Sequence, residues 1–205
     1  MRLMLEEMYM NKNDPFFRVN EISEPLNAMM MAKEFLERSE QDIYYLKWAI
    51  LAIHNALQGF MVLALKGTSN LPIIEWKKDY DGKSAYEILS DPKSKLCCFT
   101  ELFRRIKSKK YMQDTVFKDE SGKITCSISE LNNIRNQFIH YSPLGWSIGI
   151  QGMANVLVDS LFVISFLTSN CNEIQRHYEA QQLSDIRKTI EICKSLLLTY
   201  GSPNN

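Results

Sequence analysis

Apolar and polar positions follow a helical period along most of the chain. Residues 26–40 and 41–67 carry apolar side chains every three or four positions, which predicts two helices. The second segment is longer and more apolar, so it is expected to be the central helix and to end at Gly67. Residues 68–83 contain a proline, a glycine and several charges, and they are expected to form a loop.

The middle of the chain shows shorter patterns. A short helix is predicted over residues 84–91, and a longer one over residues 96–112 that ends in a group of basic residues. Residues 119–122 read Asp-Glu-Ser-Gly, a turn sequence that could join two very short strands into a hairpin near residues 116–126. The hairpin is the single β element that the pattern predicts.

The last third of the chain is predicted to form three helices. The first begins at Ser127 or Ser129, either of which suits a helix N-cap, and ends before Pro143. Two further helices follow, over residues 147–168 and 172–200, the second with a break near Leu183.

Glycine and proline are scarce, at 8 and 6 residues, which favours helices over a turn-rich β fold. The expected fold class is therefore all-α, a helical bundle. With 45% hydrophobic and 23% charged residues, the chain has the composition of a globular protein with a real core. A length of 205 residues predicts one helical domain over residues 26–200, between a lead-in of residues 1–25 and a tail of residues 201–205.

Several classes of protein fit the composition poorly. The five cysteines form no C-x-x-C pair, so neither a disulfide framework nor a zinc site is indicated, and a reducing, cytoplasmic location is expected. The first residues contain acidic side chains and lack the apolar run of a signal peptide. Residues 148–167 are the one membrane-length stretch, but Asp159 would be costly in hydrocarbon, so a buried helix without membrane contact is expected.

Charge is balanced over the whole chain but not within it. Residues 46–140 carry 15 basic and 10 acidic side chains. Five cations there fall within seven positions, a density that can hold phosphates, although a solvated helix end would look the same. These candidate RNA-binding residues are Arg104, Arg105, Lys107, Lys109 and Lys110.

The helix before Pro143 has an unusual polar face. At 100° per residue one side is an apolar stripe formed by Leu131, Ile134, Phe138 and Tyr141. His140 lies on the opposite side beside Asn136, and Arg135 stands on the flank between the two sides. The polar side is rich in amides rather than in charged residues, and asparagine is a mediocre helix former. Such a local conflict is typical of a functional or interface surface.

Arginine and histidine without a carboxylate cluster suit the cleavage of a phosphodiester that has a neighbouring 2′-hydroxyl. Histidine exchanges protons near neutral pH, and a guanidinium binds the phosphate and offsets developing charge. No metal or other cofactor is then expected. Trp146 follows this helix and could either stack on a base or pack against the protein, and packing is the favoured reading.

The string LNNIRNQFIHYSP resembles the Arg-x4-His signature of the HEPN superfamily, with a polar residue directly after the arginine. The order of helices over residues 26–170 is also similar to the HEPN layout. The resemblance implies a metal-independent endoribonuclease, a toxin or anti-phage defence effector that acts on RNA. It also implies a homodimer with two motifs in one cleft, and control by an antitoxin or regulatory protein.

Carried over by position, the resemblance makes Arg135 and His140 catalytic and Asn136 an orienting residue. One position departs from the pattern of HEPN toxins that are silenced at a tyrosine two residues after the histidine, because Ser142 stands there. Two alternatives stay open: a catalytically silent HEPN-like module that binds a nucleotide or partner, and a structural bundle. His54, in an apolar helix, is expected to be a packed or interface residue.

Overall fold

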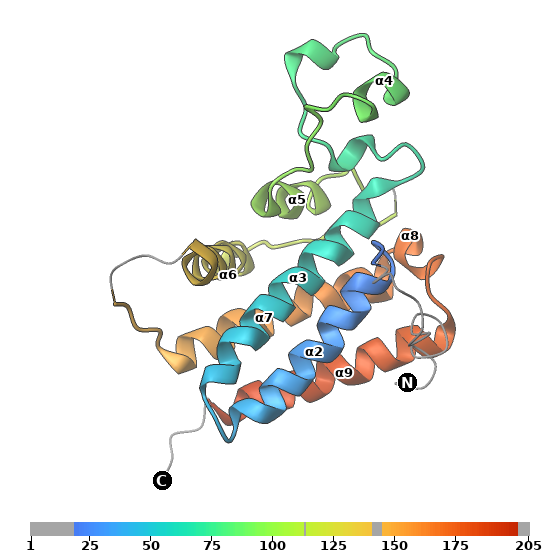
Figure 1. Cartoon of the computed structure of the whole chain (residues 1–205). Helices are drawn as coiled ribbons and strands as arrows, with labels where there is room; N and C mark the ends of the chain where they lie inside the picture. The colour runs from blue at the N-terminus through green and yellow to red at the C-terminus, as the bar shows by residue number, and fades with distance from the viewer. Residues whose placement is uncertain (1–18, 113, 141–144, 201–205) are drawn as a thin grey trace, which may run out of the picture.

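The computed structural model describes residues 19–112, 114–140 and 145–200. Over these ranges the protein is all-α, as predicted, with eight α-helices, two 3-10 helices and no strand (Figure 1). The helices, in chain order, are α2 (Ser23–Ser39), α3 (Tyr44–Lys66), η1 (Leu71–Ile73), η2 (Lys78–Tyr80), α4 (Ala85–Leu89), α5 (Phe99–Ile106), α6 (Lys123–His140), α7 (Ile150–Asn170), α8 (Asn172–Gln175) and α9 (Ala180–Thr199).

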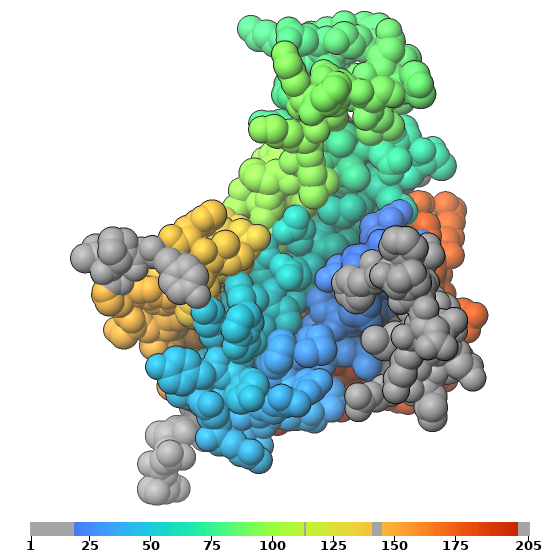
Figure 2. All heavy atoms as spheres, in the orientation of Figure 1, coloured from blue at the N-terminus to red at the C-terminus, as the bar shows by residue number. Residues whose placement is uncertain are grey.

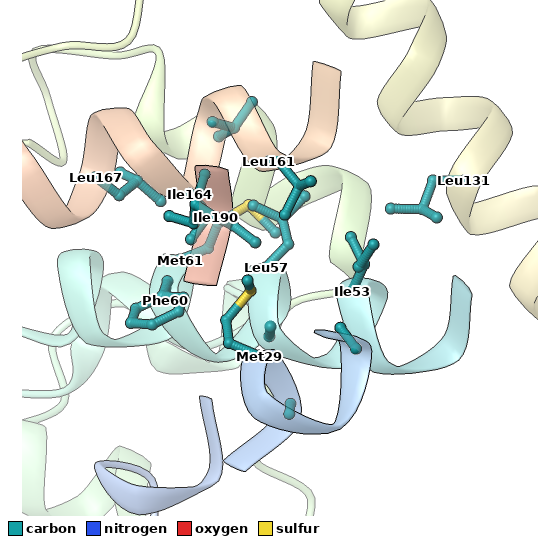
Figure 3. Close-up of a cluster of buried hydrophobic side chains, with 14 of the residues drawn as sticks. Met29, Ile53, Leu57, Phe60, Met61, Leu131, Leu161, Ile164, Leu167 and Ile190 are labelled. Atoms are coloured by element: carbon teal, nitrogen blue, oxygen red, sulfur yellow. The ribbon is translucent and has the colours of Figure 1, made fainter. Parts of the chain in front are cut away.

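Helix α3 lies at the centre of the bundle, which confirms the prediction from its apolar sequence. It contacts α2, α5, α6, α7 and α8, while α9 packs against α2 and α7 (Figure 1). Buried side chains from all seven of these helices meet in one core cluster. Figure 3 shows Met29 of α2, Ile53 and Leu57 of α3, Leu131 of α6, Leu161 and Ile164 of α7, and Ile190 of α9 in that cluster.

A close contact fixes α2 against α3. Gly59 lies in the middle of α3, where a Cβ atom would overlap the ring of Pro25 in the first turn of α2. Glycine is ordinarily unfavourable inside a helix, so its place here is explained by the approach of the two backbones.

Residues 116–126 do not form the predicted hairpin. The segment before Lys123 has no regular secondary structure, and residues 123–126 are already the first turn of α6. The Asp119 carboxylate accepts hydrogen bonds from the backbone N–H groups of Ile124 and Thr125, at 3.4 and 2.8 Å. Asp119 therefore stabilises the helix start, and the predicted N-caps Ser127 and Ser129 are wrong because both lie inside the helix.

The chain's last helical segment is broken, but not near Leu183. Helix α8 ends at Gln175 and α9 begins at Ala180. Glu179 and Gln182 form a reciprocal capping box that starts α9, while Leu183 is buried in its first turns.

Residues 68–97 form an arm that projects from the bundle (Figures 1 and 2). A single antiparallel bridge between Ile74 and Leu96 closes the base of the arm. The predicted loop contains η1 and η2, and the predicted short helix is α4, which Ser84 caps through a capping box with Glu87. Tyr80 is buried inside the arm, outside the main core cluster.

Two of the described helices, α3 and α7, are long and apolar enough to cross a membrane by length and composition. The sequence pattern predicts only the stretch that overlaps α7. Packing in the bundle accounts for the apolar character of α3, since 67% of its most apolar window is buried, against 44% for α7.

Candidate functional site

Helix α6 carries the Arg-x4-His motif and packs against α3, α5 and α7. Leu131 and Ile134 are buried in the core, as the predicted apolar stripe requires. Phe138 is only half-buried, and Tyr141 lies outside the described residues. The stripe therefore anchors the middle of the helix, and the end that carries His140 stands at the surface.

The polar side of α6 faces the solvent over most of its length. Asn133, Gln137 and His140 are exposed, and Asn136 is half-buried. His140 is the last residue of the helix, so its imidazole is accessible to a ligand from outside. Asn132 is the exception, because its side chain is half-buried and points toward α3.

Arg135 lies at the boundary between the buried and exposed sides, as expected. Its Nη1 donates a hydrogen bond to Asn136 Oδ1 at 3.0 Å, so the motif's asparagine orients the guanidinium. Arg135 Nε is buried and has no hydrogen-bond partner among the described residues. No hydrogen bond joins Arg135 to His140 within the described part of the chain, which agrees with the roughly 140° between residues five apart on a helix.

His54 lies next to the motif helix, which the sequence does not predict. This residue of α3 is 1% exposed, and its Nε2 lies 3.4 Å from Asn132 Oδ1. Its ring stacks on Phe99 of α5, with centroids 4.0 Å apart. Burial, assisted by the charge of Arg135, lowers the pKa of His54 to about 4, so the ring is neutral at physiological pH. A histidine among apolar residues in the middle of α3 was the available signal.

The five basic residues do not form one exposed patch. Helix α5 ends at Ile106, so only Arg104 and Arg105 belong to its last turn. Arg105 is 6% exposed and donates to the backbone oxygens of Pro72 and Ile74 at 2.8 and 2.9 Å, which attaches the arm to α5. The expectation that Arg105 is open to RNA is therefore wrong.

The other four cations are engaged to different degrees. Arg104 is exposed but forms two hydrogen bonds with Glu101, at 2.6 and 2.7 Å. Lys107 donates to Thr125 at the start of α6, at 2.8 Å. Lys109 and Lys110 are exposed after the helix end. These two lysines are the members of the group most open to a phosphate.

An open cavity of about 540 Å³ lies between the end of α6, the start of α3 and the segment that leads into α7. Trp146 packs on Phe138 at its wall, with ring centroids 4.9 Å apart, as the favoured reading of this tryptophan predicts. Trp146 nevertheless remains 40% exposed, so one part of its ring faces the solvent.

No cluster of three or more metal-ligating side chains occurs among the residues that the structure describes. Compared with known proteins, the chain matches no family model, no curated protein and no solved structure.

Proposed function

We propose that this protein is a metal-independent endoribonuclease of HEPN type, acting as a toxin or anti-phage effector in the cytoplasm. The observation that carries the proposal is the placement of the motif. His140 stands exposed at the end of α6, beside an uncharged amide face, while Asn136 holds the guanidinium of Arg135 at the flank. These groups match what RNA cleavage by the neighbouring 2′-hydroxyl requires.

In the proposed reaction the 2′-oxygen attacks the adjacent phosphorus, and the bond to the 5′-oxygen of the next nucleotide breaks. His140 exchanges the proton of the attacking or the leaving oxygen. Arg135 offsets the negative charge that develops on the phosphate oxygens, through its guanidinium N–H groups. The products are a 2′,3′-cyclic phosphate and a 5′-hydroxyl.

The divergence of Arg135 and His140 around α6 supports a homodimer as the active form. A two-fold axis can place His140 of one copy near Arg135 of the other, because a self-complementary interface sets residue i against residue j. Amides on this face suit such an interface, since they both donate and accept hydrogen bonds. An antitoxin or regulatory protein is a further proposed partner.

A second candidate is a catalytically silent module that binds a nucleotide or a protein partner. It is favoured by the half-buried position of Arg135, whose Nη1 is already bonded to Asn136. A half-buried guanidinium with that hydrogen bond could have a purely structural role.

Incubation of purified protein with total cellular RNA, with and without EDTA, tests the endoribonuclease. We expect cleavage in both conditions, ends that carry a 2′,3′-cyclic phosphate or 3′-phosphate, and no cleavage of DNA of the same sequence, which lacks the nucleophile. His140→Ala should be inactive, while His177→Ala, which changes a histidine outside the motif, should remain active. Equal activity of the two variants, or activity that requires added magnesium, would contradict the proposal.

A further inference from the structure

The cavity beside the motif shares a wall with the proposed catalytic site. Gln137 and Phe138 of α6 line it, together with Tyr44 and Lys47 of α3 and Trp146. On an ideal helix Gln137 lies one turn before His140 and about 60° away around the axis. A group bound in the cavity is therefore close to a phosphate held at His140.

The lining combines three aromatic rings and five aliphatic side chains with two polar groups, Lys47 and Gln137. Tyr44 is 79% exposed, although aromatic side chains are usually more deeply buried. Lys47 Nζ lies 5.4 Å from the centroid of the Phe138 ring, which places a cation at the cavity wall. The Gln137 amide can donate and accept hydrogen bonds at the rim. Aromatic faces, a cation and an amide are the groups that bind unpaired nucleotides.

We propose that this cavity holds an unpaired nucleobase of the RNA, next to the phosphate that is cleaved. The proposal rests on the proposed endoribonuclease function and names its substrate class as single-stranded RNA. Tyr44 and the open part of Trp146 stack on the base, Gln137 contacts its polar edge, and Lys47 offsets the charge of a neighbouring phosphate. The volume of about 540 Å³ is within the range of small-molecule sites and exceeds what one base needs.

Base-paired RNA does not fit this site. Bases in an A-form helix are stacked on both faces, and the deep major groove hides their edges from side chains. A base enters a cavity between two helices only when it is splayed out of the stack. The protein should therefore cut loops, bulges and ends, and should spare the same sequence inside a duplex.

The test removes the aromatic ring of Tyr44 from the protein and, separately, single bases from the RNA. Tyr44→Ala is compared with Tyr86→Ala, since Tyr86 in the arm is 80% exposed and so provides an equally accessible ring to remove. The RNA is a short single-stranded oligonucleotide in which each base around the main cut is replaced in turn by hydrogen, leaving ribose and phosphate intact.

With wild-type protein, one abasic position should lower kcat/KM by at least about fivefold, the lower end of what a stacked base contributes. Tyr44→Ala should show a similar loss on the intact RNA and little further loss on the abasic one. Tyr44→Phe keeps the ring and should behave as the wild type does, and Tyr86→Ala should too. A wild type that is insensitive to every abasic position, or a Tyr44→Ala variant equal to Tyr86→Ala, would overturn the base site.

The two proposals fail in different ways. If the base site is wrong, wild-type protein still cuts RNA and His140→Ala does not. If the nuclease proposal is wrong, no RNA is cut. The wild type and the variants are then compared by their affinity for 2′-O-methyl RNA, which lacks the nucleophile. Equal affinity of wild type and Tyr44→Ala there would overturn the base site as well. A change of oligomeric state in Tyr44→Ala by light scattering would also overturn it, and would assign the cavity to a second copy of the chain.

Discussion

His54 Nε2 lies 3.4 Å from Asn132 Oδ1 and so connects the central helix α3 to the inner edge of the motif helix. The opposite ring nitrogen, Nδ1, is buried and has no hydrogen-bond partner among the described residues. A neutral ring can leave a lone pair unpaired at modest cost. Protonation would instead bury an unpaired N–H and a positive charge near Arg135.

The pKa of His54 predicts how stability depends on pH. Because it is lowered from 6.5 to about 4 in the folded protein, the unfolded chain binds the proton more readily than the folded one. The contribution of His54 to stability is therefore complete above pH 6.5 and is lost as the pH falls toward 4. Since one pKa unit corresponds to about 1.4 kcal/mol, the loss is on the order of 3 kcal/mol. Urea unfolding across this range measures it.

His54→Gln is the control for this prediction. The variant should lose the steep dependence between pH 6.5 and pH 4, whatever its stability at pH 7. Glu101 titrates in a separate window, because hydrogen bonds from Arg104 and then Arg105 lower the pKa of its carboxyl from 4.5 to about 2. An unchanged slope in His54→Gln would show that other groups cause the dependence.

Activity and stability should separate along α6. His140→Ala removes an exposed side chain, so the free energy of unfolding should change by less than about 0.5 kcal/mol while cleavage is lost. Leu131→Ala removes a fully buried side chain and should cost about 2 to 5 kcal/mol. Melting curves measured beside the RNA assay separate loss of activity from loss of stability. A His140→Ala protein that unfolds would show that this side chain is needed for the fold.

The basic group should divide into a structural residue and RNA-binding residues. Arg105→Ala should destabilise the fold by about 3 kcal/mol, since it leaves the backbone oxygens of Pro72 and Ile74 without their buried donor. Glu101 keeps its hydrogen bonds from Arg104. Changing Lys109 and Lys110 to Ala should leave stability nearly unchanged. It should reduce the slope of RNA affinity against salt by about 0.7 for each phosphate that the protein no longer neutralises. An unchanged slope would mean that these lysines are only solvated.

Mixing two inactive variants tests the homodimer. Arg135→Ala and His140→Ala should each be inactive alone, and their mixed dimer should recover activity if one site takes Arg135 from one copy and His140 from the other. Light scattering should show a dimer at the working concentration. Full activity in a wild-type monomer would rule out the shared cleft.

The sequence by itself determined the fold class and the position of the motif. Helical periodicity depends on neighbouring residues, so it located α2, α3 and α7 and separated Leu131 and Ile134 from the exposed His140. Prediction from the sequence was least reliable where one residue type suits two local structures. Asp119 reads as a turn residue and as a helix cap equally well, and only the second reading matches the structure.

The tertiary structure alone decided what each polar side chain meets. Asn132 belongs to the same amide face as Asn133 in sequence, yet packing of α6 on α3 turns it toward His54, 78 residues earlier in the chain. Arg105 is buried because the arm returns to α5 and supplies two backbone oxygens. The cavity at Tyr44, Gln137 and Trp146 likewise joins three segments. Such contacts depend on how helices distant in sequence are rotated against one another. The periodicity of a single helix does not specify that rotation.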